Sequence, residues 1–238
     1  MNPPGWIWRK RRAESESSSA PGTPTRRSWP GFWDGMGRGK PDLMRAVEMI
    51  SSEKIGLFGG SFDPIHHGHL ILARDAMESL GLDRVIFIPV NVSPHKLARP
   101  PVAARLRCEM VAAAIAGEPR FSMDACEAER EGPSFAVDTV RLMRQRFPKA
   151  DFFYFIGDDN VPGLHTWREI DALREMATFV VIARGDLQPL EGFPVISRQI
   201  DISSTDIRNR IAHGLSVRYL LPDAVSAILA RHQLYLND

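Results

Sequence analysis

Three histidines and two glycines directly follow an apolar run in the segment "KIGLFGGSFDPIHHGHL", residues 54–70. The run at 54–58 is typical of a buried strand, and residues 67–80 form a helical pattern that ends at Gly81. The cluster is therefore expected on a strand-to-helix turn. In open α/β sheets, ligands bind at such turns, at the carboxyl ends of the strands.

The residue types in this turn suit a phosphate site. Gly59 and Gly60 allow close approach of the backbone, whose N–H groups can hold phosphate oxygens. His66 and His69 are three residues apart near a helix start, so both rings can face the same anion. Two other interpretations remain open. The histidines could bind a metal together with Asp63, or they could have only a packing role. The spacing is that of neither the dinucleotide fingerprint nor the P-loop.

A second candidate segment is "ISSTDIR", residues 202–208. Ser204 or Thr205 is expected to open a helix, and Arg208 one turn later can reach a phosphate in fork geometry. Alone, this pattern is no more specific than a capping box. Together with the histidine turn, it predicts two helix N-termini that hold a triphosphate from both sides.

Apolar strands alternate with helices along the rest of the chain, which indicates an α/β fold with a parallel sheet. We expect a Rossmann-like, doubly wound parallel sheet with helices on both faces, in a single domain at 51–238. Strands are expected at 54–58, 84–90, 120–124, 151–157 and 178–184. Helices are expected at 67–80, 102–116, 134–147 and 166–176, followed by one after the "ISST" segment and one with Pro222 at its first position.

The bulk composition excludes several classes of protein. A hydrophobic content of 44% in 238 residues is enough for a core, and a formal net charge of +1 gives no general case for nucleic acid. Two cysteines form no disulfide framework, which favours a reducing, cytoplasmic compartment. No uncharged apolar run approaches the roughly 18 residues that cross a membrane. The oligomeric state is not predicted.

Residues 1–50 have a different composition, rich in Arg, Ser, Pro and Gly, and are expected to be a disordered N-terminal extension. Three interpretations remain open. The true start could be Met36, Met44 or Met49; the tail could be dispensable or regulatory; or its basic cluster at 9–12 could serve targeting or nucleic-acid binding. No apolar segment follows the basic cluster, which disfavours a secretory signal.

The histidine turn and the "ISST" segment together resemble the H-x-G-H and S-S-T-x-x-R signatures of the nucleotidylyltransferase superfamily. The fuller pattern is similar to the nicotinate-nucleotide adenylyltransferase family and spans about 54–236. Its motifs appear in order as "GGSFDPIHHGHL" (59–70), "PVNVSPHK" (89–96), "PSFAVDT" (133–139), "GDDN" (157–160), "TWREI" (166–170), "ISSTDIR" (202–208) and a terminal segment at 221–235. Val92 and Ser93 depart from the family's usual loop residues.

The resemblance implies transfer of the adenylyl group of ATP to nicotinate mononucleotide, giving deamido-NAD and pyrophosphate, a step of NAD biosynthesis. Mg²⁺ would enter with ATP, and no protein residue is predicted to bind a metal. The resemblance assigns His66, His69 and Arg208 to catalysis, and Thr139 and Trp167 to the nicotinate nucleotide. The implied ATP-binding residues are Gly59, Gly60, Ser61, Phe62, His66, His69, Lys96, Gly157, Asp159, Ser204, Thr205 and Arg208.

Several alternative functions remain open. The same phosphate machinery could act on nicotinamide mononucleotide or phosphopantetheine, although "PSFAVDT" and "TWREI" favour the nicotinate nucleotide. A class I aminoacyl-tRNA synthetase also has a similar histidine turn, but this chain is short for one and lacks its second signature. Outside the enzymes, the chain could be a non-catalytic nucleotide sensor or a nucleic-acid binder that uses its basic tail. A sensor would be expected to lose His66, His69 or Arg208, and all three are present.

Overall fold

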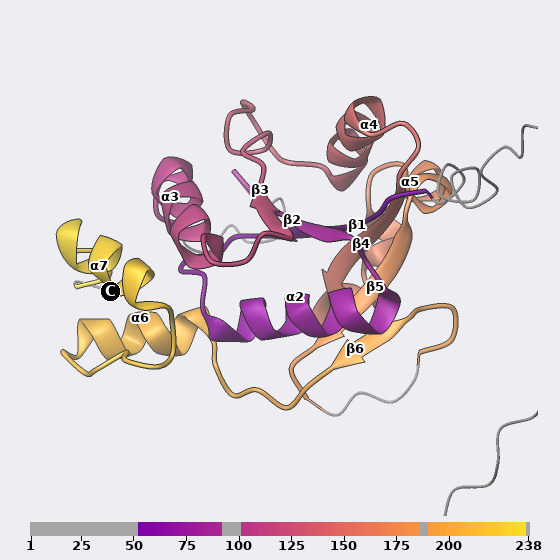
Figure 1. Cartoon of the computed structure of the whole chain (residues 1–238). Coiled ribbons are helices and arrows are strands. Elements are labelled where there is room, and N and C mark those ends of the chain that lie inside the picture. Colours follow the sequence, from indigo (N-terminus) through magenta and orange to yellow (C-terminus); the bar gives the residue numbers. More distant parts are fainter. Residues whose placement is uncertain (1–51, 92–100, 186–189, 237–238) are drawn as a thin grey trace, which may run out of the picture. The chain divides into compact units, whose positions relative to one another are not determined.

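Six parallel strands form one sheet in the computed structural model, which describes residues 52–91, 101–185 and 190–236 (Figure 1). The predicted extension at 1–50 lies outside the described residues. The strands are β1 (Lys54–Gly60), β2 (Arg84–Pro89), β3 (Phe121–Met123), β4 (Asp151–Gly157), β5 (Thr178–Ala183) and β6 (Val195–Ser197). Their order across the sheet is β3-β2-β1-β4-β5-β6, which confirms the predicted doubly wound fold.

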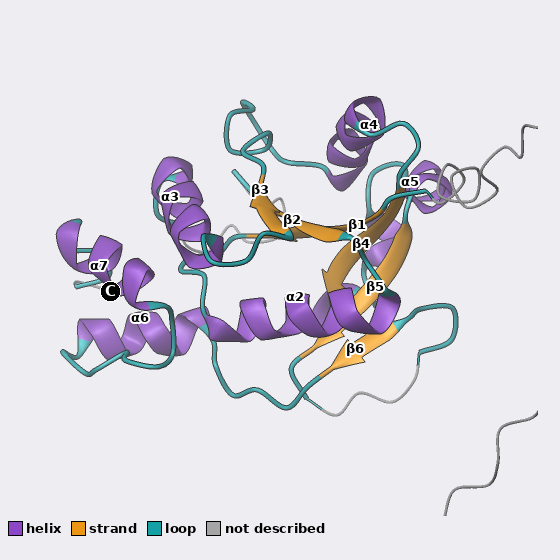
Figure 2. Ribbon diagram, viewed as in Figure 1, coloured by secondary structure: helices purple, strands orange, loops and turns teal. Residues whose placement is uncertain are grey.

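Helices connect the strands from β1 to β5, and two more helices follow β6 (Figure 2). They are α2 (His67–Leu80), α3 (Ala104–Ile115), α4 (Ala136–Arg146), α5 (Ile170–Met176), α6 (Ser204–Ala212) and α7 (Asp223–Arg231), with 3-10 turns η1 (Asp158–Asn160) and η2 (Leu164–Thr166). Within the described residues, no helix is long and apolar enough to cross a membrane.

Successive residues of each strand point to opposite faces of the sheet, and both faces are covered by helices. In β2, Val85 and Phe87 pack into the core under α2 and α3, whereas Ile86 and Ile88 pack into the core under α4 and α5. The outer strands repeat this alternation, and α2 and α4 lie on opposite sides of the sheet in Figure 1. The near-continuous apolar strands of the sequence therefore have a direct physical cause.

The strand order reverses beside β1. The chain passes from β1 outward to β2 and β3, and then returns to place β4 against the other edge of β1. Ligands of doubly wound folds bind at this reversal, outside the carboxyl ends of the strands. The predicted functional turn begins at the carboxyl end of β1, where Gly59 pairs with Ile88 and Gly60 with Pro89 of β2.

Several predicted boundaries differ from the structure. The helix expected at 166–176 begins only at Ile170, because Trp167 is extended and Glu169 has a left-handed φ of 52°, neither of which continues a helix. Strand β6 is not among the predicted strands. Helix α6 begins at Ser204, as predicted, with Ser203 as its N-cap, whereas Pro222 is the N-cap of α7 and not its first residue.

Candidate active site

The histidine turn packs its two rings against each other. His66 and His69 are stacked with ring centroids 3.8 Å apart, and the backbone N–H of His66 donates to Nδ1 of His69 at 3.2 Å. Gly68 makes room for this arrangement, since a Cβ there would lie 3.0 Å from two atoms of the His66 ring. The ring of Phe62 meets that of His69 edge-on at 5.2 Å. The structure therefore places the two histidines side by side as a stacked pair.

His66 is the inner member of this pair. It is fully buried, while His69 is partly exposed, and neither ring nitrogen of His66 has a hydrogen-bond partner within the described residues. Burial, followed by the positive charge of Arg184, lowers the pKa of His66 to about 3. The imidazole is therefore neutral near pH 7. A buried polar ring without a partner is costly, so its presence points to a functional role.

Helix α6 brings the second predicted segment to the same turn. Ser204 Oγ donates to the carbonyl oxygen of Pro64 at 2.9 Å, and Nη1 of Arg208 donates to that of Asp63 at 2.8 Å. Thr205 Oγ1 accepts from Nη2 of Arg208 at 3.3 Å. The structure thus joins two segments about 140 residues apart in the sequence and places Ser204, Thr205 and Arg208 beside the histidine turn.

A cavity of about 300 Å³ opens on the other side of β1, at the reversal of strand order. Gly59, Gly60 and Ser61 form one wall, and Trp167 another. The rest of the lining comes from Val90, Glu127, Ser134, Phe135, Ala136, Tyr154, Phe155, Ile156, Gly157, Asn160, Thr166 and Arg168. An aromatic wall with a few polar groups is typical of a small-molecule site.

Aromatic neighbours hold the Trp167 ring in place. It meets Tyr154 edge-on at 6.3 Å and Phe179 at 6.2 Å, both within the core under α4 and α5. The prediction that this ring contacts a ligand is not tested by the structure. Its position on the wall of the cavity is compatible with that prediction.

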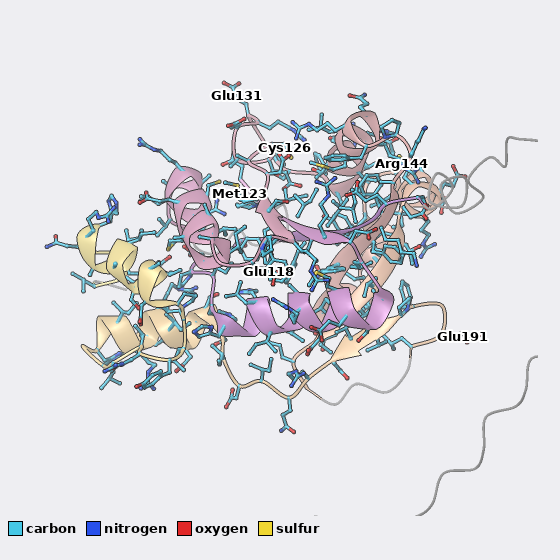
Figure 3. All side chains as sticks on the ribbon, viewed as in Figure 1. Glu118, Met123, Cys126, Glu131, Arg144 and Glu191 are labelled. Carbon is cyan, nitrogen blue, oxygen red and sulfur yellow. The ribbon has the colours of Figure 1, made fainter. Side chains whose placement is uncertain are left out.

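The lining of the cavity also includes a buried carboxyl group that the sequence did not indicate. Glu127 lies in the loop between β3 and α4, and it accepts a 2.6 Å hydrogen bond from Thr139 and a further one from Ser134. Burial raises the pKa of Glu127 despite these bonds. Figure 3 shows Glu131 at the outer end of the same loop, whereas Cys126 lies nearer the sheet.

The other predicted residues occupy different positions. Thr139 is fully buried and does not line the cavity itself, but its hydroxyl donates to Glu127, which does. Gly157 lines the cavity at the end of β4, while Asp159 is exposed in η1 and accepts from Nδ2 of Asn160 at 2.7 Å. Lys96 lies outside the described residues.

Two buried charged residues, Asp63 and Arg107, hold this turn in place, a role that the sequence does not predict for either of them. Asp63 Oδ1 accepts from the hydroxyl of Tyr235 at 2.7 Å and from the N–H of Val102 at 3.1 Å. Arg107 is fully buried and donates to the carbonyl oxygens of Ser61 and Asn91, the residues that follow β1 and β2. Their partners are distant in sequence, so no local motif could have identified them.

The alternative metal site finds no support in this arrangement. Among residues 52–91, 101–185 and 190–236, no group of three or more His, Cys, Asp or Glu side chains is placed to hold a metal ion. Asp63 instead accepts hydrogen bonds from Tyr235 and Val102.

Comparison with known proteins identifies the class of protein that this fold and site define. The family model described as cytidylyltransferase-like matches residues 57–210, from β1 to α6. A solved structure of the Plasmodium falciparum nicotinic acid mononucleotide adenylyltransferase complexed with NaAD has the same fold. Its TM-score is 0.64 at 18% identity, over 78% of this chain and 98% of that one.

Curated relatives narrow the class further. A protein of Lactiplantibacillus plantarum named "Probable nicotinate-nucleotide adenylyltransferase" is 41% identical over 196 residues, which cover 81% of this chain and 93% of that protein. A protein of the same name from Thermus thermophilus is 45% identical over 186 residues, covering 76% and 99% respectively. The chain belongs to the nicotinate-nucleotide adenylyltransferase family, as the motifs of its sequence predict.

Proposed function

We propose that the chain transfers the adenylyl group of ATP to nicotinate mononucleotide, giving deamido-NAD and pyrophosphate. The observation that carries this proposal is the arrangement of two sites around the end of β1. A helix-end phosphate site with His66, His69 and Arg208 lies on one side, and an aromatic cavity with Trp167 lies on the other. Two nucleotides bound there would meet over Gly59 and Gly60.

The reaction needs placement and charge stabilisation rather than a protein nucleophile. A phosphate oxygen of nicotinate mononucleotide attacks the α-phosphorus of ATP and forms a new P–O bond. The bond from the α-phosphorus to the bridging oxygen breaks, and pyrophosphate leaves with the electron pair. His69, the more exposed histidine, and the neutral ring of His66 donate to the phosphate oxygens as negative charge moves onto the leaving group.

The other predicted residues are also divided between an ATP site and a nicotinate mononucleotide site. Arg208, Ser204 and Thr205 hold the β- and γ-phosphates from the start of α6, and Lys96 approaches them from its loop. Gly59, Gly60, Ser61 and Phe62 shape the backbone around the phosphates, and Gly157 and Asp159 bind the ATP ribose. Trp167 stacks on the pyridine ring, and Thr139 contributes by fixing Glu127 on the cavity wall.

Mg²⁺ is expected to enter with ATP, held by phosphate oxygens and water. When bound, the ion would neutralise phosphate charge. A cytoplasmic location is part of the proposal and is supported by the two cysteines, both of which are free.

The test is to identify the product. The full chain is incubated with ATP, Mg²⁺ and nicotinate mononucleotide, and the reaction is followed by mass spectrometry and a pyrophosphate assay. We expect deamido-NAD and pyrophosphate in equal amounts, with neither formed when the mononucleotide is omitted. Pyrophosphate release without the dinucleotide, or no reaction with any acceptor, would contradict the proposed function.

A further inference from the structure

The C-terminal part of the chain contacts the histidine turn at points beyond α6. The carbonyl oxygen of Leu220 accepts from the backbone N–H of His67, the first residue of α2, at 3.0 Å. The hydroxyl group of Tyr235, which follows α7, donates to Oδ1 of Asp63 at 2.7 Å across 172 positions of the sequence. The end of the described chain therefore holds the turn that is proposed to bind the phosphates of ATP.

The hydrogen bond between Tyr235 and Asp63 is enclosed by the protein. Tyr235 is 6% exposed and Asp63 is 8% exposed, and a buried carboxylate is costly unless hydrogen bonds satisfy it. Oδ1 of Asp63 accepts from Tyr235 and from the N–H of Val102. Burial, and then the charge of Asp63, raise the pKa of Tyr235, so its hydroxyl group keeps the proton that it donates. Charge-assisted bonds are strong, and this one fixes the side chain of Asp63.

The segments on both sides of this bond have unusual backbone conformations. Tyr235 has a left-handed φ of 63°, and Phe62, the residue before Asp63, has a left-handed φ of 47°. Residues with bulky side chains rarely adopt this region, and the strain persists only where the surrounding structure imposes the conformation. Strained residues of this kind cluster at functional sites. The turn therefore depends on contacts such as the Tyr235 hydrogen bond to keep its shape.

Asp63 in turn contacts the guanidinium group of Arg208. Its carbonyl oxygen accepts from Nη1 of Arg208 at 2.8 Å, and its Oδ2 lies 4.0 Å from the same nitrogen. Asp63 thus meets Arg208 through both its backbone and its carboxylate. The placement of this guanidinium matters, because a shift of about 1 Å in a group that positions a substrate can cost about 10²-fold in rate. Tyr235 is linked to Arg208 through this one intermediate residue.

We infer that Tyr235 is a positioning residue for the reaction, whose hydroxyl group fixes the carboxylate of Asp63 and thereby orients Arg208 and the histidine turn toward the phosphates of ATP. This inference rests on the proposed function, because it takes the turn and Arg208 to be the ATP phosphate site. Tyr235 is not among the residues that line the cavity with Trp167, so the binding of nicotinate mononucleotide should not depend on it.

The test measures binding of one substrate at a time, so that it does not depend on turnover. Isothermal titration of the full chain gives the Kd of ATP with Mg²⁺ and, separately, that of nicotinate mononucleotide. Tyr235→Phe keeps the buried ring and removes only the hydroxyl group. We expect the Kd of ATP to rise roughly tenfold, the lower end for a hydrogen bond to a charged group, and that of the mononucleotide to stay within about twofold. A loss of folded protein would lower the number of binding sites and leave both Kd values unchanged.

Two control variants separate position from stability. Tyr219→Phe makes the same substitution at an exposed tyrosine that also has a left-handed φ, and it should leave both Kd values unchanged. Val225→Ala opens a cavity in the core at α7, so it should lower the unfolding temperature without changing the Kd of ATP. Thermal unfolding is measured for every variant. If Tyr235→Phe does not fold, Asp63→Asn weakens the same bond by removing the charge, and should raise the Kd of ATP in the same way.

A double-mutant cycle shows whether Tyr235 acts through Arg208. In an Arg208→Ala background, Tyr235→Phe should change the Kd of ATP by less than about twofold, because the group that it orients is gone. An unchanged Kd of ATP in Tyr235→Phe, an equal rise for the mononucleotide, or a full effect without Arg208 would overturn the inference. Each of these results is compatible with adenylyl transfer. If the chain makes no deamido-NAD but the predicted binding pattern is found, Tyr235 positions a phosphate site and only the proposed reaction fails.

Discussion

At the scale of single residues, the two stacked histidines have different environments and different expected roles. The ring of His66 is buried, and neither of its nitrogens has a hydrogen-bond partner among the described residues, whereas His69 is partly exposed beside Phe62. A neutral buried imidazole can still donate one N–H to an anion without the cost of carrying a charge. The more exposed ring is the one that solvent-borne phosphates reach first.

Replacing His69 tests its catalytic role. In His69→Ala we expect kcat to fall by about 10²–10³, the scale of one preorganised donor, because the transition-state charge loses a hydrogen bond. Steady-state kinetics measures this effect, and thermal unfolding should show that the fold persists. His213→Ala is the control, since His213 lies at the end of α6 away from the turn and should leave kcat unchanged. A fully active His69→Ala would refute the assignment.

The lowered pKa of His66 predicts its protonation state. Ring ¹⁵N chemical shifts, assigned with a His66→Asn variant, should remain those of a neutral imidazole from pH 8 to pH 5, because the pKa lies near 3. The unfolded chain takes up this proton near pH 6.5, so the residue lowers stability as the pH falls from about 6.5 toward 3. Protonation with a midpoint near 6.5 would contradict the buried environment.

At the scale of elements, the start of α2 is built around the histidine pair. Gly68 is buried in the first turn of this helix, where a side chain would compete with the His66 ring for space. Glycine within a helix costs about 1 kcal/mol relative to alanine. Glycine at position 68 therefore lowers the stability of the helix but leaves space for the His66 ring.

A Gly68→Ala variant separates these two effects. We expect kcat to fall roughly tenfold or more, because the added methyl group lies 3.0 Å from the His66 ring and must displace it. The unfolding temperature should not fall along with kcat, since alanine favours the helix. Kinetics and thermal unfolding on one preparation measure both quantities. Full activity would mean that the position of the His66 ring is not critical.

The elements differ in how much of them the sequence could predict. The bounds of α2 and β4 are those predicted, because a capped helical pattern and an uninterrupted apolar run are strong local signals. The late start of α5 depends on the left-handed Glu169, whose side chain pairs with Arg141 on another helix. No local pattern encodes that contact.

Some residues of the candidate site could be predicted from the sequence, and others could not. His66, His69, Ser204 and Arg208 belong to short motifs whose chemistry can be recognised, and the structure brings them together. Glu127 and Arg168 both line the cavity, and only folding brings them there. Their local sequence carries no sign of that, because ligand-lining positions depend on long-range packing.

At the scale of the whole molecule, two nucleotide sites share the end of one strand. The two cores hold the sheet from both faces, and each contributes to one site. Phe62 and Ile65 of the histidine turn belong to the core with α2 and α6, while Tyr154 and Trp167 belong to or pack on the other. A substitution in one site should therefore leave the binding of the other substrate largely unchanged.

Removal of residues 1–50 tests whether the N-terminal extension is needed for the reaction. The match to the family model begins at residue 57, so we expect kcat and both KM values to stay within about twofold of the full chain. Steady-state kinetics on the shortened chain measures this. A large rise in the KM for ATP would instead assign the basic tail a role in binding phosphates.

The central claim, that the two substrates occupy separate sites on either side of β1, is tested most directly by initial rates with both substrates varied. Trp167→Ala should raise the KM for nicotinate mononucleotide roughly tenfold, the scale of losing one stacking partner, and leave that for ATP unchanged. Arg208→Ala should raise the KM for ATP and leave that for nicotinate mononucleotide unchanged. This crossed pattern would support the account, whereas Trp167→Ala that impairs ATP binding and spares the mononucleotide would contradict it.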